Sequence, residues 1–440
     1  MTWEGRRPRS KSAGPSQKNY EIDIMNRTIV EKIIQARTAD EVAAGRTVWM
    51  DLDIRTARDF GGPNVVKNYE REYGEAPPAD AKKTFFTFDL CVPACSLRYA
   101  DNQQLCRDFA ARHGIEVFDV DRGIGTHVLI EEGLARPGAT IVGTDSHMNI
   151  LGAVGAFGQG MGDVDITFAF RSGRTWFKVP ETVKVVLKGS PRPGVSAKDI
   201  TLFLCRELGT KKIALKAAEF MGDAVAGLSF PGRVTLCSMV TEMAGIIGFV
   251  PELNPAAGEE MRVYAGSPVS PLEPDRAAVY GEEIVLNIDG LSPQVAEPPS
   301  PAHVRDAAEL GGRKIQSGFI GSCTNGRTED FARAAAILKG RRVAKGVMLK
   351  IVPATRRVYE ELMTKGILED LFQSGAIIVN PGCGGCAEGH VGLTGKGEVQ
   401  ISTGNRNFPG KQGQGLTYLA SPSVVAASCL RGEISDPEDV

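Results

Sequence analysis

Three cysteines in glycine-rich segments are the residues of this sequence whose type and spacing point most directly to chemistry. Cys323 stands in GSCTNGR, and Cys383 and Cys386 stand further along the chain in PGCGGC. Each segment follows a short apolar run that we expect to be a buried strand, and ligand sites of α/β proteins gather at the carboxyl ends of such strands. Thiolates are natural ligands of iron–sulfur clusters, and glycines let backbone N–H groups approach the sulfur atoms.

The spacing of the three thiols does not by itself identify the group that they bind. A [4Fe–4S] cluster held by three thiolates keeps one iron without a protein ligand, and that iron can act as a Lewis acid on a substrate oxygen. A zinc ion with His390 of CAEGH as its fourth ligand is a second interpretation. A redox-active C-G-G-C pair is a third. A single C-x-x-C motif does not decide between them.

Two further polar segments follow predicted strands and supply more candidate site residues. VGTDSHMN lies between a buried strand and a glycine-rich stretch, and packing alone does not explain its three adjacent polar side chains. STGNRNFPGK has the composition of a turn, where an arginine can bind a carboxylate through two hydrogen bonds and a lysine can bind one as a point charge. The candidate residues of the two segments are Asp145, Ser146, His147, Asn405, Arg406 and Lys411.

Short β-like runs alternate with amphipathic helical patterns, which predicts an α/β fold. A strand at 84–90, a helix at 96–114 and a helix at 197–209 are the clearest elements. We expect three domains after a leader, and a Pro- and Ser-rich linker before the last of them. The expected divisions are 1–25 (leader), 26–180, 181–290, 291–303 (linker) and 304–440.

The amino-acid composition and net charge indicate which kinds of partner and cellular location to expect. The chain has 440 residues, 42% of them hydrophobic, and a formal net charge of −2, so neither nucleic acid nor an anionic membrane is indicated as a partner. Glycine or charge interrupts every apolar run, and we expect no transmembrane helix. Nine cysteines without a secretory signal indicate the reducing cytoplasm. Residues 1–25 are basic and polar, and we expect a disordered leader or, alternatively, an organelle transit peptide.

The cysteines outside the two glycine-rich segments stand mostly in apolar or helical-looking contexts. We expect them to be small buried hydrophobic residues. They are Cys91, Cys95, Cys106, Cys205, Cys237 and Cys429.

GSCTNGR, PGCGGC, GTDSH and TGNRNF, in this order and at these separations, resemble the motifs of the aconitase superfamily, most of all the large subunits of isopropylmalate isomerase and homoaconitase. The resemblance covers about 27 to 430. It implies a three-domain α/β architecture with mostly parallel sheets and a [4Fe–4S] cluster at the domain interface. It also implies a hydro-lyase or isomerase that removes and adds water at a hydroxy-dicarboxylic acid. The residues it assigns are Cys323, Cys383 and Cys386 as cluster ligands, Asp89, Asp145, His147 and Glu242 as catalytic, and Ser146, Asn405, Arg406 and Lys411 as substrate-binding.

The family's base is a serine on a fourth, swivelling domain, and this sequence ends before such a domain. The resemblance therefore implies a separate small subunit that carries the swivel domain and the serine. The substrate would be an isopropylmalate-, homocitrate- or alkylmalate-like acid.

The sequence departs from the family's pattern at two histidines. Leu90 stands where a histidine usually follows Asp89, and Thr126 stands at another histidine's place, with His127 one step on. Neither leucine nor threonine can act as a general acid at neutral pH. Protons would then come from His147, from His127 or from the small subunit. A catalytically degenerate relative that acts as an iron–sulfur sensor or binding protein is the alternative function.

Overall fold

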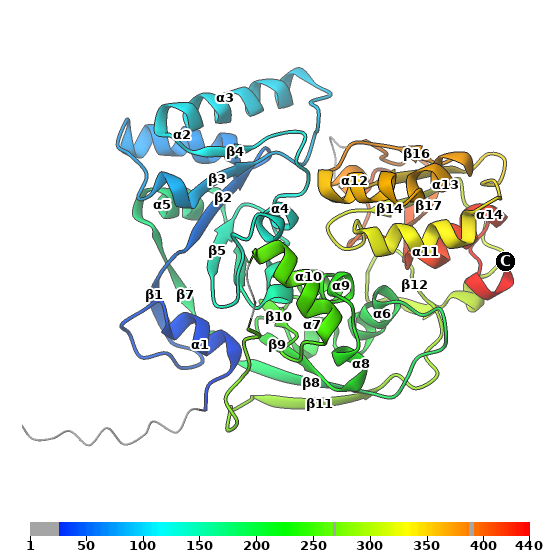
Figure 1. Ribbon diagram of the computed structural model, residues 1–440, viewed down its shortest axis with the longest axis horizontal. Coiled ribbons are helices and arrows are strands. Elements are labelled where there is room, and N and C mark those ends of the chain that lie inside the picture. The colour runs from blue at the N-terminus through cyan, green and yellow to red at the C-terminus, as the bar shows by residue number, and fades with distance from the viewer. Residues whose placement is uncertain (1–25, 267–269, 387–390) are drawn as a thin grey trace, which may run out of the picture.

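The computed structural model of the protein describes residues 26–266, 270–386 and 391–440. In this part of the chain, helices alternate with mostly parallel strands, and the strands form four sheets (Figure 1). The predicted α/β class is confirmed. The predicted leader, residues 1–25, and the candidate zinc ligand His390 lie outside the described residues.

The amino-terminal sheet is parallel and has the order β4-β3-β2-β5-β6. Successive side chains of its strand β3 point to opposite faces. Phe86 packs edge-on against Phe109 and Phe170, whereas Phe85 stacks on Phe118. The strands are β2 (Ile54–Arg58), β3 (Thr84–Thr87), β4 (Glu116–Phe118), β5 (Thr140–Gly143) and β6 (Phe157–Gly160), and the helices are α2 (Gly62–Tyr73), α3 (Leu97–His113), α4 (Gly125–Glu131) and α5 (Asp163–Ser172).

An antiparallel ribbon and one helix complete this part of the chain. The ribbon pairs β1 (Thr47–Asp51) with β7 (Arg174–Lys178), and α1 (Ile29–Gln35) precedes it. Figure 1 shows the ribbon and α1 at the lower left, beside the amino-terminal sheet and the sheet that follows.

The middle of the chain forms a four-stranded parallel sheet with the order β10-β9-β8-β11. Strand β8 buries every second side chain: Val183, Val185 and Leu187 are fully buried. The helix predicted at 197–209 is confirmed as α6, and the hydroxyl oxygen of Ser196 accepts a backbone N–H at its start. The strands are β8 (Thr182–Lys188), β9 (Ala217–Met221), β10 (Ile247–Phe249) and β11 (Glu282–Asn287), and the helices are α6 (Ala197–Glu207), α7 (Gly209–Lys212), α8 (Asp223–Ala226), α9 (Phe230–Met239) and α10 (Pro255–Ala265).

The cysteine segments belong to a seven-stranded sheet with the order β13-β12-β18-β17-β14-β15-β16. The predicted linker 291–303 is wrong at its centre, because Val295 and Ala296 are fully buried in β12, which pairs with β13 and β18. The strands are β12 (Gln294–Ala296), β13 (Val304–Asp306), β14 (Ser317–Gly321), β15 (Met348–Val352), β16 (Ile377–Ile378), β17 (Val399–Ser402) and β18 (Leu416–Ala420), and the helices are α11 (Thr328–Leu338), α12 (Arg356–Thr364), α13 (Ile367–Gln373) and α14 (Pro422–Arg431).

The three larger sheets share one hydrophobic core. The largest cluster of buried apolar residues contains Ile54 of β2, Val183 of β8 and Leu419 of β18. Close packing of this kind fixes the strand ends of the different sheets relative to one another. We propose that the three predicted domains correspond to these three sheets, with β12 added to the last.

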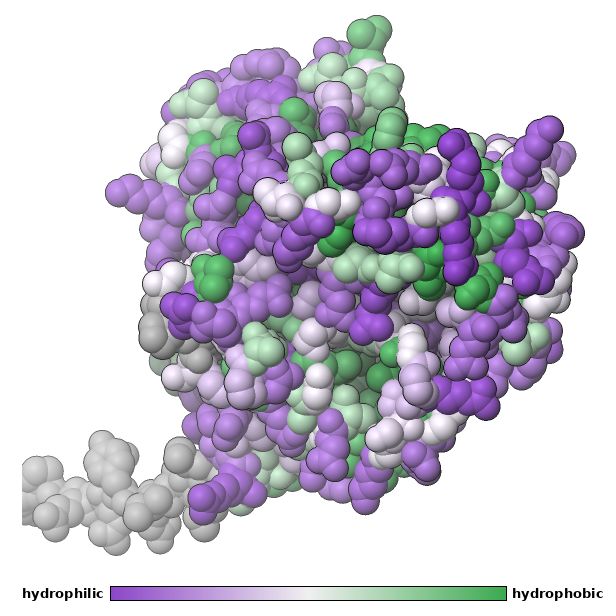
Figure 2. All heavy atoms as spheres, turned by 45° about the vertical axis from the view of Figure 1, so that its right-hand side comes forward, coloured by the Kyte–Doolittle hydropathy of each residue, from purple (hydrophilic) through white to green (hydrophobic). Residues whose placement is uncertain are grey.

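The surface drawn in Figure 2 is mostly hydrophilic, and hydrophobic residues show between hydrophilic ones rather than as one continuous patch. Among the helices of the described residues, none combines the length and the hydrophobicity that crossing a bilayer requires.

Candidate active site

A cavity of about 370 Å³ lies where strands of the amino-terminal and the seven-stranded sheets end. Most of the site residues predicted from the sequence lie on its walls, although they are far apart in the chain. The lining residues are Arg58, Phe60, Leu90, Thr144, Asp145, Ser146, His147, Cys323, Cys383, Cys386 and Lys411. The other predicted residues form hydrogen bonds with lining residues: they are Asp89, Glu242, Asn405 and Arg406.

The three thiols come from two loops, and none of them is in a disulfide. Cys323 follows β14, and the Nδ2 of Asn405 lies 3.5 Å from its sulfur. Cys383 and Cys386 follow β16 in a turn that needs glycine: Gly384 has a φ of 58°, and a Cβ there would come within 2.8 Å of the Phe319 ring. The glycines of PGCGGC therefore let the turn pack closely beneath its two cysteines.

Burial keeps the sulfur atoms of Cys323 and Cys383 protonated when no cation is near. It raises the pKa of Cys323 to about 12, and it raises the pKa of Cys383 well above its ordinary value. The guanidinium of Arg58 opposes this effect at Cys383, because its Nη2 donates to the sulfur at 2.8 Å. A bound metal group would stabilise the thiolates further, since a coordinated thiol is deprotonated.

His147 stands at the centre of a charged network on another wall. Its Nε2 lies 2.9 Å from Oε1 of Glu242, and the Nε of Arg406 donates to both oxygens of the same carboxylate at 2.9 Å. The Oγ of Ser146 lies 3.3 Å from Nδ1 of His147 and 3.5 Å from an Nη of Arg406. Although burial raises the pKa of Glu242, the hydrogen bonds and charges of His147 and Arg406 outweigh it and hold that pKa below its ordinary value.

Arg58 is a central residue of the site that the motifs of the sequence do not reveal. Its guanidinium donates to Asp89 at 2.6 and 2.9 Å and lies 3.2 Å from Asp145, in addition to its contact with Cys383. Burial raises the pKa of Asp89 to about 7 against the opposing charge of Arg58, whereas Arg58 and His147 hold the pKa of Asp145 below its ordinary value despite burial. The sequence signal that could have indicated Arg58 is its position, because it is the last residue of an otherwise buried strand.

Lys198 positions the turn that carries Asn405. Its Nζ donates to the backbone carbonyl oxygens of Thr403 and Gly404 at 2.9 and 2.8 Å, and burial lowers its pKa to about 8. The Nδ2 of Asn405 in turn donates to the hydroxyl oxygen of Ser238 at 3.0 Å. The sequence showed Lys198 only as a residue near a helix start, and its fully buried ammonium group was not foreseen.

The hypothesis that His127 supplies a proton is wrong, because its side chain is fully buried and does not line the cavity. Its Nε2 donates to the backbone carbonyl oxygen of Cys323 at 2.9 Å, and its Nδ1 accepts from Arg327 at 3.2 Å. Burial and the charge of Arg327 lower the pKa of His127 to about 3. The ring is therefore neutral and holds the backbone behind the thiol.

The two departures from the family's histidines lie in different places. Leu90 lines the cavity and gives it an apolar surface beside Phe60. Thr126 is 1% exposed, and among the described residues its hydroxyl has no hydrogen-bond partner. Neither side chain can take over the chemistry of an imidazole.

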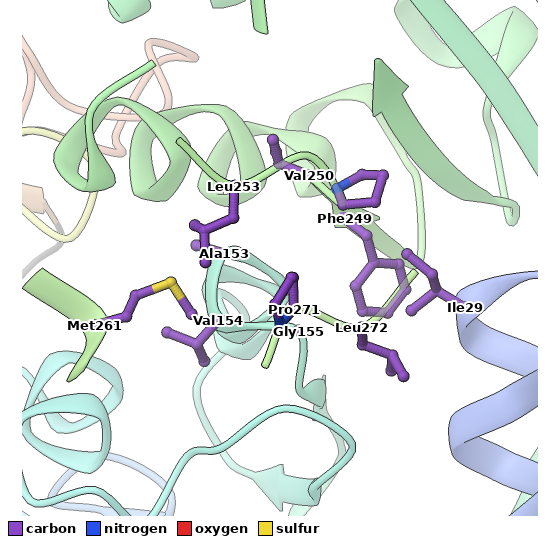
Figure 3. A pocket seen from close by; sticks show the side chains of 12 residues that line it. Ile29, Ala153, Val154, Gly155, Phe249, Val250, Leu253, Met261, Pro271 and Leu272 are labelled. Atoms are coloured by element: carbon purple, nitrogen blue, oxygen red, sulfur yellow. The ribbon is translucent and has the colours of Figure 1, made fainter. Parts of the chain in front are cut away.

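A second cavity has no comparable chemistry. Figure 3 shows that its lining side chains are apolar, among them Ile29, Phe249, Met261 and Leu272. Its volume is about 20 Å³, little more than the space one water molecule needs. This cavity is a packing gap between elements, and the larger one is the candidate site.

Three thiols, a carboxylate, a histidine and basic side chains line one cavity in an α/β fold, an arrangement typical of an enzyme active site rather than of a binding module. The family model for aconitase (aconitate hydratase) matches residues 31–309 and 304–432. The chain belongs to the aconitase family.

Relatives cover nearly the whole chain. The sequence is 41% identical to the 3-isopropylmalate dehydratase large subunit 1 of Methanopyrus kandleri over 94% of this chain and 99% of that protein. It is also 41% identical to the homoaconitase large subunit of Thermus thermophilus, over 94% and 98% of the two chains. A probable methanogen homoaconitase large subunit of Methanothermobacter thermautotrophicus is 37% identical over 94% and 98%.

Proposed function

We propose that the chain is the large subunit of a [4Fe–4S]-dependent hydro-lyase or isomerase that dehydrates or rehydrates a hydroxy-dicarboxylic acid. The observation that carries the proposal is the single cavity in which Cys323, Cys383 and Cys386 lie with Asp145 and His147. The names of the relatives, 3-isopropylmalate dehydratase and homoaconitase large subunits, support the same reaction class.

The residues present fit a cluster better than a single metal ion. Among the described residues no group of three His, Cys, Asp or Glu side chains could hold one metal ion, and His390, the fourth ligand of the zinc interpretation, lies outside these residues. A cubane spreads its thiolates over separate irons, so the ligands need to surround a cavity rather than meet at one point. Cys323, Cys383 and Cys386 would hold it, and Asn405 and Arg58 offer N–H donors to two of the sulfur atoms.

When bound, the cluster supplies an iron without a protein ligand, which acts as a Lewis acid on the substrate's hydroxyl group. The protein's own groups then bind and orient the acid. Arg406, fixed by Glu242, and Lys411 on the cavity wall bind carboxylates. His147 lines the cavity, and its Nε2 donates to the carboxylate of Glu242, which orients the ring so that Nδ1 is the atom that would give a proton to a departing hydroxyl group.

Leu90 and Phe60 make part of the cavity wall apolar. We infer that they face the alkyl part of the substrate, as expected for an isopropylmalate- or alkylmalate-like acid. A leucine in this position excludes water and offers no proton. Proton transfer at the site then depends on His147 and on the partner subunit.

The partner we propose is a small subunit with a swivel domain and a serine base. Relatives carry "large subunit" in their names, which supports an assembly of two chains. We also infer a reducing compartment, the cytoplasm, since all nine cysteines of the chain are outside disulfides.

Anaerobic reconstitution tests the proposal. The chain should take up about four iron atoms and turn brown, and with its small subunit it should turn over members of a panel of 2-alkylmalates and 3-alkylmalates. Cys383→Ser should lose most of the iron and all measurable turnover. Cys429→Ser is the matched control, because Cys429 is equally buried in the core of the seven-stranded sheet, away from the cavity. Colourless protein, or unchanged iron in Cys383→Ser, would refute the cluster.

A further inference from the structure

Two cysteines outside the candidate site lie against each other. The sulfur atoms of Cys91 and Cys95 are 3.0 Å apart, in the segment that joins β3 to α3. Cys91 is buried, whereas Cys95 is exposed. The prediction of a buried hydrophobic residue is wrong for Cys95, because residues 95–98 lie on the surface. The pair thus joins a protected sulfur to one that solutes can reach.

The turn before the pair holds Cys91 in place. The carboxylate of Asp59 accepts the backbone N–H groups of Leu90 and Cys91 at 3.1 and 3.3 Å. Gln103 donates to the same carboxylate and to the carbonyl oxygen of Cys91, both at 3.0 Å. Cys91 is therefore anchored, and the surface segment with Cys95 is the side that can adjust.

A disulfide needs little movement from this arrangement. Its S–S bond is about 2.05 Å long, so the two sulfur atoms must approach by roughly 1 Å. The backbone N–H of Cys95 already donates to the sulfur of Cys91 at 3.1 Å, which stabilises negative charge on that sulfur. Since Leu90 lines the cavity and immediately precedes Cys91, the pair lies beside the candidate active site.

We propose that Cys91 and Cys95 form a reversible thiol–disulfide couple that hydroperoxides oxidise through the exposed Cys95. In the first step the Cys95 sulfur attacks the O–O bond of hydrogen peroxide, which gives a sulfenic acid and one water. In the second step the Cys91 sulfur attacks the Cys95 sulfur and displaces the hydroxyl group. The protons of the two thiols leave in the two water molecules, both sulfur atoms are oxidised, and peroxide is reduced.

The environments of the two thiols set this order of events. Burial, together with the contact between its sulfur and the sulfur of Cys95, raises the pKa of Cys91 to about 11, although the backbone N–H of Cys95 opposes this effect. A protected and protonated thiol is a poor first target for peroxide, whereas an adjacent thiol can resolve a sulfenic acid. A dithiol reductant of the thioredoxin class reverses the reaction by thiol–disulfide exchange at the exposed sulfur.

The sequence permits a direct test by peptide mapping. Trypsin releases both cysteines in one peptide, residues 84–98, and it releases Cys106 alone in residues 99–107. The reduced full-length chain is treated with about one equivalent of hydrogen peroxide, unfolded, alkylated and digested. We expect most of peptide 84–98 to resist alkylation and to be lighter by about 2 Da, the mass of two hydrogen atoms, and dithiothreitol to reverse this change. Peptide 99–107 should be fully alkylated throughout.

Two variants give the order of the steps. In Cys91→Ser, Cys95 should stop at the sulfenic acid, which dimedone traps. In Cys95→Ser, Cys91 should stay reduced. Recovery of doubly alkylated peptide 84–98 from the oxidised wild type, or oxygen on Cys95 with an alkylated Cys91, would overturn the proposal. Because the test counts thiols and needs neither iron nor turnover, it stands apart from the proposed function.

Discussion

Two buried histidines near the candidate site have opposite surroundings. His147 lines the cavity, and its Nε2 meets the carboxylate of Glu242 at 2.9 Å. His127 lies behind the cavity, between the cation of Arg327 and the carbonyl oxygen of Cys323. The guanidinium of Arg327 disfavours a charged imidazole at His127, whereas the carboxylate of Glu242 forms a hydrogen bond with the ring of His147.

The surroundings of His147 suit a role in catalysis, whereas those of His127 suit a structural role. A histidine that can hold and release a proton beside the substrate suits acid catalysis, whereas one that is locked neutral fixes a loop. Each of the two networks contains one arginine. Arg406 donates to Glu242, the carboxylate that contacts His147, whereas Arg327 connects His127 to Glu131 and Tyr264. Substitutions in the two networks should therefore change different measurable quantities.

Replacing Arg406 by alanine should have the largest effect on turnover. The variant loses a carboxylate-binding group and the guanidinium that fixes Glu242, so we expect kcat/KM to fall by roughly 10³-fold while the iron content and visible spectrum stay unchanged. Arg406→Lys is the matched control and should recover part of the loss, because lysine keeps the positive charge but cannot form the two parallel hydrogen bonds of a guanidinium group. Steady-state kinetics with the small subunit measures both, and activity within a few-fold of wild type in Arg406→Ala would contradict the carboxylate-binding role.

Replacing Arg327 by methionine should instead lower stability. The buried guanidinium contacts Glu131 at 3.5 Å and Glu260 at 3.6 Å, and removing it leaves the nine-tenths buried Glu131 without its cation. We expect the free energy of unfolding to fall by about 3–5 kcal/mol, measured by urea denaturation. A control nearer the surface, Arg333→Met, removes only a half-exposed pair with Glu329 and should cost less than about 1 kcal/mol. Equal stability of Arg327→Met and wild type would make the His127 network structurally unimportant.

The sequence predicted the walls of the site better than their support. Asp145, His147 and Cys323 follow buried strands, and a polar group at that place is visible as a break in an apolar run. Arg58 and Lys198 were missed as site residues because only the folded chain shows that their cations meet buried carboxylates, a sulfur or carbonyl oxygens. The β12 strand was missed for a related reason: its few apolar residues stand among prolines, and pairing with a distant strand decides their structure.

Replacing each histidine by glutamine sharpens the comparison directly. His147→Gln removes a titratable group from the cavity wall, and we expect kcat to fall by about 10²-fold with little change in unfolding free energy. His127→Gln keeps hydrogen-bonding capacity at a buried site, so kcat should change by less than about threefold. Kinetic and denaturation measurements on both variants test these two expectations. Equal losses of kcat in the two variants would mean that the two histidines do not have separate roles.

The pH dependence of stability is the finest test of the same difference. Folding holds His127 neutral, with its pKa lowered from 6.5 to about 3, whereas the unfolded imidazole binds a proton below its ordinary pKa. Between these two values the unfolded chain binds more protons than the folded chain, so this residue makes the protein less stable as the pH falls. The expected slope is about 1.4 kcal/mol per pH unit, and it should vanish above about pH 7.

Urea denaturation of the iron-free chain from pH 7 to pH 4.5, for wild type and His127→Gln, isolates this contribution, because other acidic groups titrate in both proteins. The wild type should lose stability more steeply than the variant, and the gap should close at neutral pH. Parallel curves would mean that His127 is accessible to protons in the folded chain. In that case the contact with Arg327 would not hold the ring neutral, and the structural role assigned to it would fail together with its contrast to His147.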